Sequence, residues 1–328
     1  MTTYNLDQAT FNAGLLALVS QNTATLVSDS LTNAGLMQPG TLRDPVPGSV
    51  PGPTTIGSGA YFIYTGANGT TSDVTTSGGN ILSTGYLGGS ITDTGPGNDT
   101  LVGGDTWGTT LQVMSGNNTL LAGHGTETLL GGSGNDVMWG GGLSSMVAGS
   151  GNDTIHGGQF SWSSDTLVGG SGADILGVAH GNNVIWSGSD ATLSNATLYG
   201  GDGNDTMHGG EHAGDHVTLY AGAGNDTMGD ANGSNLYYGG SGHDSIYMGA
   251  GNDTFQSAGG TDVIYTGQGN ATVFGGTGST QITESNTQAA IASQHVVGGV
   301  TQITFTSGQV LEAKGAAINF NGGGTINT

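Results

Sequence analysis

Hydrophobic and polar residues recur along this chain with a period of nine. Between Ala221 and Thr283 the period runs without a break through AGAGNDTMG, DANGSNLYY, GGSGHDSIY, MGAGNDTFQ, SAGGTDVIY, TGQGNATVF and GGTGSTQIT. The shared pattern has glycines at the first, second and fourth positions, an acid or its substitute at the sixth, and an apolar residue at the eighth. Such a period predicts a stack of similar units instead of an ordinary globular core.

The residues around the eighth position predict a short strand in every unit. In Thr227-Met228-Gly229 successive side chains point to opposite faces, so only the middle one reaches an interior. Two units would make one turn of two strands, with glycines of positive φ at corners where a Cβ would clash. The predicted interior is a column of eighth-position residues: Leu101, Leu120, Leu129, Met138, Ile155, Leu176, Ile185, Met207, Met228, Ile246, Phe255, Ile264, Val273 and Ile282.

The same unit returns upstream with interruptions. Its copies are TGPGNDTLV, AGHGTETLL, GGSGNDVMW, AGSGNDTIH, GGSGADILG, VAHGNNVIW and GGDGNDTMH, and a looser version starts near Gly57. Insertions around Phe160, Ala191 and Ala213 separate several copies, so the sequence does not show which of them share an edge.

These motifs resemble the calcium-binding nonapeptide G-G-x-G-x-D-x-U-x of the repeats-in-toxin (RTX) family over about two-thirds of the chain. The resemblance implies an all-β fold, a parallel β-roll or β-helix solenoid with calcium between corners two repeats apart. It also implies type I export through an uncleaved C-terminal signal, and folding triggered by calcium outside the cell. Parallel crossovers predict a right-handed winding.

One apolar side chain per unit is too little to hold such a coil together. Burying an aliphatic side chain contributes about 1.5 to 3 kcal/mol, whereas ordering the backbone of each residue costs about 1 to 2 kcal/mol. Leu, Ile, Val and Phe make up about a fifth of the chain, and the formal net charge is -22, a composition at the border of disorder. Cations at the corners would supply the missing stability.

The sixth-position side chains are the candidate ligands. Asp226, Asp244 and Asp262 would stack about 4.8 Å apart on one edge, where like charges repel unless a divalent cation lies between them. Carbonyl oxygens and flexible loops favour calcium over magnesium. A solvated surface of Asx turns is the alternative, and it leaves the charge excess unexplained. The predicted calcium ligands are Asp99, Asn118, Glu127, Asp136, Asp153, Asp174, Asn183, Asp205, Asp226, Asn235, Asp244, Asp253 and Asp262.

The two edges of the coil are predicted to differ in affinity. The edge from Asp226 to Asp262 should bind two ions, whereas the opposite edge from Asn235 to Ala271 should bind weakly or not at all. Thr280 replaces the acid further on, so the ladder of sites ends before the coil does. Upstream, Asn118 and Asp136 would share an edge.

The chain is predicted to have three segments. Residues 1–56 form a cap or a docking arm, with a short amphipathic helix within residues 5–36 and a stiff linker RDPVPGSVPGP. Residues 57–283 form the β-roll. Residues 284–328 contain the alternating runs VTQITFTSG and GAAINFNGG, which predict a closing β-cap and are compatible with a secretion signal.

The net charge of the chain disfavours some classes of binding partner. The chain has 24 acids against Arg43 and Lys314, which disfavours nucleic acid and anionic membrane surfaces, since both require basic patches. Cysteine is absent, so disulfides and thiolate zinc sites are excluded. The early apolar run Leu15–Val19 is short and has no basic flank, unlike a cleaved signal peptide or a membrane span. We therefore expect an extracellular or cell-surface protein, exported without a cleaved N-terminal signal.

Aromatic residues recur at the ninth position, where a side chain should point outward. Exposed aromatics on flat sheets bind sugar rings or another sheet, and the simpler interpretation is that they stack along the ladder. They are Trp139, Trp186, Tyr199, Tyr220, Tyr238, Tyr247, Tyr265 and Phe274.

Three classes of function remain open. The leading one is a calcium-stabilised structural protein that self-associates in a surface layer, matrix or filament. The second is a glycan-binding or adhesin module whose partner is a cell-surface or matrix polysaccharide. The third is a polysaccharide lyase or epimerase, for which Asp190, Glu211, Asp215 and Asp230 show no pairing. Neither H-E-x-x-H nor G-x-S-x-G occurs, and we expect no enzyme.

One segment, from His208 to His216, formally contains the zinc motif H-x-x-E-H. That motif needs a helix, which the glycines around it disfavour. The segment is predicted to be a polar surface loop, with a transition-metal site from His212, Asp215 and His216 as the alternative.

Overall fold

The structure is a computed structural model that describes residues 43–46, 54–56, 61–64, 71–76, 78, 81–83, 89–104, 108–158, 162–188, 195–276 and 279–328. The predicted helix within residues 5–36 and the start of the repeats near Gly57 lie outside these residues. The chain divides into two compact units, the first Met1–Gln159 with Ser163–Leu167 and the second Phe160–Trp162 with Val168–Thr328.

The first unit consists of two parallel sheets, and the chain alternates between them from strand to strand. Strands in the same sheet are one full turn apart in sequence, as β9, β11 and β13 show by pairing in order. The first sheet contains β1 (Arg43–Val46), β3 (Tyr61–Tyr64), β5 (Ile81–Ser83), β7 (Thr100–Val102), β9 (Thr119–Leu121), β11 (Val137–Trp139) and β13 (Thr154–His156). The second contains β2 (Thr54–Ile56), β4 (Thr71–Thr76), β6 (Ser90–Asp93), β8 (Thr109–Val113), β10 (Thr126–Ser133) and β12 (Leu143–Ser150).

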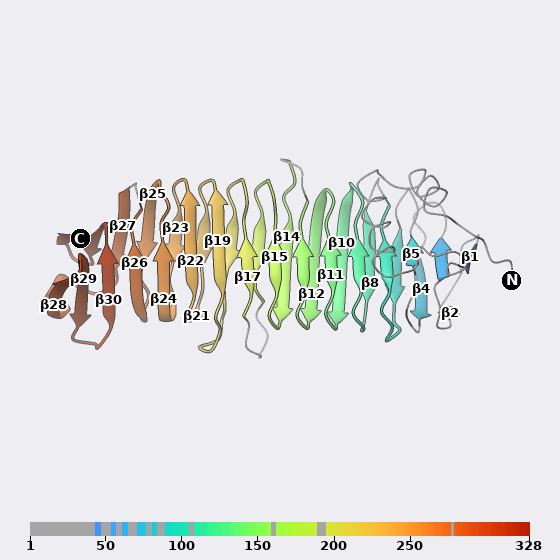
Figure 1. Cartoon of the computed structure of the whole chain (residues 1–328), viewed down its shortest axis with the longest axis horizontal. Helices are drawn as coiled ribbons and strands as arrows, with labels where there is room; N and C mark the ends of the chain where they lie inside the picture. Colours follow the sequence, from blue (N-terminus) through green and yellow to red (C-terminus); the bar gives the residue numbers. More distant parts are fainter. Residues whose placement is uncertain are drawn as a thin grey trace. The chain divides into compact units, whose positions relative to one another are not determined.

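The second unit repeats this arrangement, and Figure 1 shows its strands stacked side by side from β17 to β26. One sheet contains β15 (Ile175–Gly177), β17 (Thr197–Tyr199), β19 (Thr218–Ala223), β22 (Leu236–Ser241), β24 (Ala250–Gln256), β26 (Asn270–Phe274) and the short β21 (Asn232–Gly233). The other contains β16 (Val184–Trp186), β18 (Thr206–His208), β20 (Thr227–Gly229), β23 (Ser245–Tyr247), β25 (Thr261–Tyr265) and β27 (Ser279–Glu284). Strand β14 (Thr166–Ser171) contains the boundary between the units.

The last part of the chain departs from the parallel pattern. Strands β30 (Val310–Lys314) and β31 (Ala316–Phe320) extend the two sheets in parallel to β26 and β27. Strands β28 (Ile291–Val297), β29 (Val300–Phe305) and β32 (Thr325–Asn327) then pair antiparallel, after one turn of 3-10 helix at Gln288–Ala290. Both alternating runs of the C-terminal segment therefore contain strands, as their pattern indicates.

The interior of each unit is the predicted column of eighth-position side chains. All fourteen predicted residues, from Leu101 to Ile282, have no solvent-exposed surface. The three-residue strands bury their middle residue only, as in β20, because successive side chains point to opposite faces. The all-β parallel solenoid is thereby confirmed, and the handedness of its winding stays a prediction.

The turn length is eighteen residues through the contiguous repeats of the second unit, whereas Met138 and Ile155 in the first unit pair seventeen residues apart. Met228 pairs with Ile246, and Ile246 with Ile264. The insertion around Ala213 lengthens one turn, because Met207 pairs with Met228 twenty-one residues on. The register of the apolar column survives the insertion, so the loop is extruded at a corner.

Glycine is required at the corners by both conformation and space. Gly240 has a φ of 86°, and a Cβ there would lie 2.0 Å from the carbonyl oxygen of Gly222 in the preceding turn. Successive corners are thus in backbone contact, and this contact brings the sixth-position side chains of adjacent turns together.

Candidate metal sites at the corners

Sixth-position side chains of the second unit form a continuous column at one corner. Each backbone N–H donates to the Oδ1 of the acid in the next turn: Asn183 to Asp205 at 2.7 Å, Asp205 to Asp226 at 2.7 Å, Asp226 to Asp244 at 3.0 Å and Asp244 to Asp262 at 3.3 Å. The column therefore extends upstream of the three acids whose stacking the regular repeats predict, and it joins acids on both sides of an insertion.

Most acids of this column bury their second carboxylate oxygen without a hydrogen bond. The Oδ2 atoms of Asp205, Asp226 and Asp244 are inaccessible to solvent and accept no hydrogen bond. Asp262 differs, because its Oδ2 accepts a hydrogen bond of 2.5 Å from the Ser257 hydroxyl. A buried carboxylate oxygen without a donor is costly unless a cation compensates it.

The same burial raises the pKa values of these acids. Loss of solvation raises the pKa of Asp205 to about 6, against hydrogen bonds from Asn183 that lower it. Loss of solvation, together with the charges of Asp226 and Asp262, raises the pKa of Asp244 to about 7. Ionising the column at neutral pH is therefore unfavourable in the absence of a counterion.

Oxygen atoms from two adjacent turns lie beside the first-position glycines Gly131 and Gly200. A Cβ at Gly200 would lie 2.4 Å from the Ala221 carbonyl oxygen and 2.9 Å from the Asp205 Oδ2. At Gly131 the Ala148 carbonyl oxygen would lie at 2.4 Å and the Asp136 Oδ2 at 2.8 Å. Calcium takes carboxylate and carbonyl oxygens as ligands, so the chemistry of these residues fits this ion.

The first unit has an equivalent column. Asp99 N–H donates to the Asn118 Oδ1 at 2.9 Å, Asn118 to Asp136 at 2.6 Å, and Asp136 to Asp153 at 2.6 Å. Asn118 and Asp136 thus share an edge, as the sequence predicts. The Asp136 Oδ2 is buried without a hydrogen bond, and desolvation with the neighbouring Asp153 charge raises the pKa of Asp136 to about 7.

The opposite corner of the first unit contains Asp165, an acid that lies outside the repeat motifs. Glu127 pairs in register with Ser144, whose hydroxyl lies 3.5 Å from the Glu127 Oε2. Ser144 N–H in turn donates to the Asp165 Oδ1 at 2.8 Å. Asp165 is 1% exposed, and burial raises its pKa. No glycine repeat precedes it, and the sequence D-T-L-V-G-G around it was the available signal.

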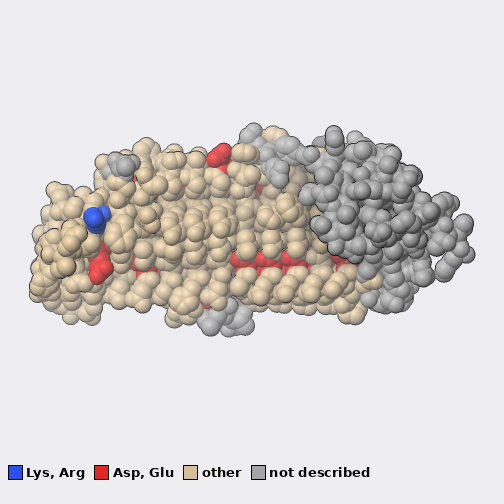
Figure 2. Space-filling view, viewed as in Figure 1, with Lys and Arg blue, Asp and Glu red and all other residues tan. Residues whose placement is uncertain are grey.

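All predicted ligands lie in buried corner positions. None of the thirteen is more than 3% exposed, including Asp174, whose carbonyl accepts the Thr197 N–H. Figure 2 shows acidic side chains in a recessed row between uncharged residues on one face. Eleven of the thirteen are hydrogen-bonded in columns whose successive members are one turn apart, and Glu127 lies opposite Ser144.

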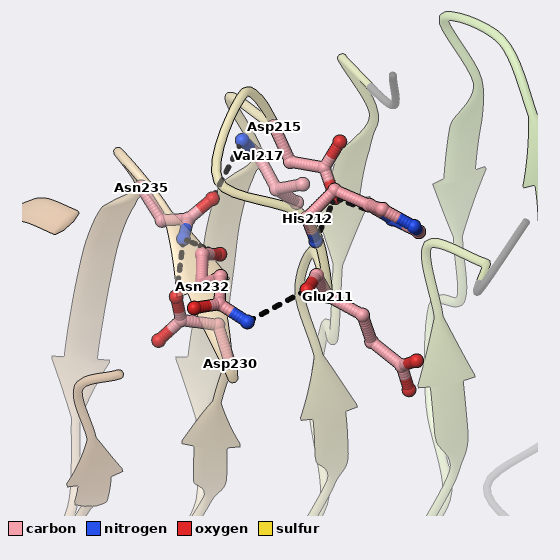
Figure 3. A network of polar contacts seen from close by, with 7 residues as sticks. All are labelled: Glu211, His212, Asp215, Val217, Asp230, Asn232 and Asn235. Carbon is pink, nitrogen blue, oxygen red and sulfur yellow. Dashed lines mark hydrogen bonds and ion pairs between the residues drawn. The ribbon is translucent and has the colours of Figure 1, made fainter. Parts of the chain in front are cut away.

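The opposite corner of the second unit is built differently, with hydrogen bonds between side chains (Figure 3). Asn235 N–H donates to the Asp253 Oδ1 at 2.9 Å, and its Nδ2 donates to the Asp230 Oδ2 at 2.5 Å. The Tyr237 hydroxyl and the Gly249 N–H also donate to Asp230. An amide, a hydroxyl and a backbone N–H thus satisfy the Asp230 carboxylate at this corner. Weak calcium binding on this edge stays a prediction.

Fifth-position asparagines form a second ladder, which the repeat pattern alone did not predict. Asn117 N–H donates to the Asn98 Oδ1 at 2.7 Å, Asn135 to Asn117 at 2.7 Å, and Asn152 to Asn135 at 2.8 Å. These side chains are exposed, so they link successive corner tips without a metal. The two ladders together account for the Asn-Asp pair in the repeat.

The loop from His208 to His216 gathers no transition-metal site. Asp215 accepts the His212 N–H at 2.9 Å, while the His216 Nδ1 lies 3.2 Å from the Ser234 carbonyl oxygen. Among the residues that the structure describes, no three His, Cys, Asp or Glu side chains converge as metal ligands. The corner columns differ from such a cluster because backbone carbonyls would supply most of their ligands.

In the described part of the chain no helix has the length and apolar character to cross a membrane.

The repeat motif of this chain matches that of a known protein family. A family described as RTX calcium-binding nonapeptide repeat matches more than half of the chain. The matched segments are residues 93–106, 108–138, 139–159, 161–193, 197–213, 214–229, 218–246, 230–264, 238–273 and 247–282. No curated protein matches the sequence.

Proposed function

Because the chain belongs to the RTX calcium-binding nonapeptide repeat family, we propose that it is a secreted, calcium-stabilised structural protein. It would form or attach to a cell-surface layer, an extracellular matrix or a filament. Export would proceed without a cleaved N-terminal signal.

The column of buried carboxylates carries this proposal. Asp205, Asp226 and Asp244 each keep one oxygen buried without a hydrogen bond, an arrangement that is unfavourable unless a cation binds there. Asp136 repeats the arrangement in the first unit. Calcium would be held by these carboxylates and by carbonyl oxygens such as those of Ala148 and Ala221. Its binding would be coupled to folding, because the corners exist only when turns stack.

The test is far-UV circular dichroism of the purified chain during calcium titration and after chelation. We expect a sheet-rich spectrum in calcium and a largely disordered spectrum in chelator. Magnesium at the same concentration is the control, and it should produce little sheet. A spectrum that is equally sheet-rich in chelator would contradict the calcium-stabilised fold.

The structural role needs a separate measurement, because a folded monomer would also pass the first test. The aromatic stacks on the outer faces support association of faces: exposed Tyr199 and half-buried Tyr220 and Tyr238 stack at 4.9 and 4.6 Å, with interplanar angles of 5° and 1°. Val296 and Val297 on β28 are 66% and 75% exposed. Electron microscopy of the calcium-loaded protein should show sheets or filaments, and a uniform monomer at high concentration would contradict this role.

A glycan-binding or adhesin module is the second candidate, favoured by the same aromatic stacks, since sugar rings pack on aromatic faces. Binding of the calcium-loaded monomer to matrix polysaccharides would distinguish it from self-association.

Of the acids considered for a lyase or epimerase, Asp215 and Asp230 are held in hydrogen-bond networks and Asp190 lies outside the described residues. An assay for uronate cleavage tests that alternative.

A further inference from the structure

The outer face of one sheet in the second unit carries a column of aromatic rings with a gap. The ninth positions of β16, β18, β20, β23 and β25 pair in register as Trp186, His208, Gly229, Tyr247 and Tyr265. Four of the five members carry a ring, and Gly229 carries no side chain. The column is therefore interrupted at its centre by the width of one strand.

On each side of Gly229 two rings from neighbouring strands are in contact. Trp186 and His208 have their ring centroids 4.2 Å apart and are tilted by 35°, whereas Tyr247 and Tyr265 are stacked, with centroids 4.8 Å apart and an interplanar angle of 5°. His208 and Tyr247 lie two strands apart, which is about 9.6 Å at the usual strand spacing. The gap is thus one rung high and accommodates a single planar group between two rings.

A pocket occupies this gap. Its volume is about 480 Å³, with Trp186 and His208 on one side, Tyr247 on the other and Gly229 in the floor. Trp186 and Tyr247 are 38% and 48% exposed, so their rings are accessible to a partner. The walls are therefore aromatic faces, which attract planar and cationic groups.

Two acids line the pocket at its corner end. Asp230 is held in place by the hydrogen bonds from Asn235 and Gly249. Glu211 is exposed, and its backbone carbonyl accepts a hydrogen bond of 2.7 Å from the Asn232 side chain. Figure 3 shows the Glu211 carboxylate turned away from the Asp230 network. The Glu211 backbone is thus fixed while its charge remains available.

We propose that this pocket binds the guanidinium group of an arginine side chain on a partner polypeptide. The guanidinium stacks between His208 and Tyr247 in place of the ring that Gly229 lacks, and it pairs with the Glu211 carboxylate. Guanidinium is planar, stacks on aromatic faces and matches a carboxylate with two parallel N–H groups.

Charge decides between this occupant and the alternatives. No Lys or Arg is among the residues that line the pocket, and the whole chain carries 24 acids against two bases. An anionic sugar such as a uronate is therefore repelled. A neutral sugar or an aromatic side chain gains the stacking but leaves Glu211 unpaired, so both are weaker occupants. The inference concerns a partner and does not depend on whether the protein assembles into layers or filaments.

The experiment compares three short blocked peptides on the full chain in calcium, by NMR titration or calorimetry. They are identical except for a central arginine, citrulline or lysine. The arginine peptide should bind at least about tenfold more tightly than the citrulline peptide, which keeps the planar shape without the charge. Lysine should also be weaker, because an ammonium group does not fill a planar gap.

Two variants locate the binding. Gly229→Tyr completes the aromatic column, and its backbone has no positive φ, although the new Cβ would lie 3.3 Å from that of Tyr247. It should reduce arginine binding at least about tenfold. The matched control is Gly177→Tyr, which lengthens the other ring column beside Tyr199 and leaves the pocket intact.

Glu211→Gln provides a second test if Gly229→Tyr fails to fold in calcium, because Glu211 is exposed on a loop. It should weaken the arginine peptide several-fold and leave the citrulline peptide unchanged. Equal affinity for arginine and citrulline would overturn the proposal, as would tighter binding of a neutral oligosaccharide that Gly229→Tyr abolishes. Undiminished binding to Gly229→Tyr would place the arginine site elsewhere and also overturn it.

Discussion

Replacing Asp244 by asparagine is expected to change the stability of the coil in opposite directions with and without calcium. The Asp244 Oδ1 accepts the Asp226 N–H at 3.0 Å, and an asparagine carbonyl oxygen preserves that bond. The Oδ2, which is buried without a hydrogen bond, becomes an uncharged amide group. The variant therefore removes the charge of one corner while it keeps the backbone ladder.

The magnitudes follow from the position of Asp244 in its column. Without metal, the pKa of about 7 against a usual 3.8 corresponds to an upper limit of about 4 kcal/mol above pH 7, which solvent near the corner reduces to about 1 to 2 kcal/mol. This cost disappears in Asp244→Asn. In the proposed calcium-bound state Asp244 would be shared by the sites toward Asp226 and Asp262, and each site filled at a hundredfold excess over its Kd would contribute about 2.7 kcal/mol. The variant should then lose up to about 5 kcal/mol.

The assay is thermal and denaturant unfolding at pH 7.5, followed by circular dichroism in calcium and in chelator. If the chelated wild-type chain is too disordered for a transition, its residual sheet signal is compared with that of the variant, which should be larger. Asp202→Asn is the matched control, because it removes one charge from an exposed side chain that contacts His180 at 3.1 Å. A change of the same sign in both conditions would refute the role of the buried carboxylates.

Further outcomes follow from the same geometry. Burial raises the pKa of Asp136 and Asp244 in the folded chain to about 7, so the metal-free coil binds more protons than the unfolded chain between about pH 4 and pH 7. The sheet content in chelator should therefore fall as the pH rises through that range. Protons compete with calcium for the same oxygens, so the calcium midpoint should rise at least about tenfold between pH 8 and pH 6, and a pH-independent midpoint would contradict this. Gly240→Ala should prevent or severely destabilise calcium-induced folding, since its Cβ would lie 2.0 Å from the Gly222 carbonyl oxygen. The control Gly308→Ala should lower the free energy of unfolding far less, because a Cβ there has no atom within 4 Å. Asn117→Ala should lower the unfolding free energy in calcium by about 1 kcal/mol in denaturant unfolding, because it removes one bond of the ladder and no metal ligand, and a loss as large as that of Asp244→Asn would contradict this.

The repeat itself determined the fold and most of the candidate site. An apolar residue every ninth position specifies which side chain of each strand is buried, because strand geometry leaves one inward position in three residues, and Leu101 to Ile282 are buried accordingly. The glycine and aspartate positions likewise specify a corner and its carboxylate. Where the units are contiguous, the eighteen-residue turn also predicted that Asp226, Asp244 and Asp262 share an edge, as their hydrogen bonds show.

Only the tertiary structure decided which acids stack across insertions. Asp205 stacks on Asp226 only because the insertion around Ala213 is extruded as a loop at the corner. A nine-residue motif does not specify how such an insertion is accommodated. Asp165 lies in a corner column although no glycine repeat precedes it, and only the hydrogen bond from the Ser144 N–H in the preceding turn shows its place. The pocket at Gly229 also needed the structure, since Trp186, His208 and Tyr247 are distant in sequence. Periodicity specifies what each residue does within its own turn, whereas contacts between turns depend on where the chain inserts extra residues.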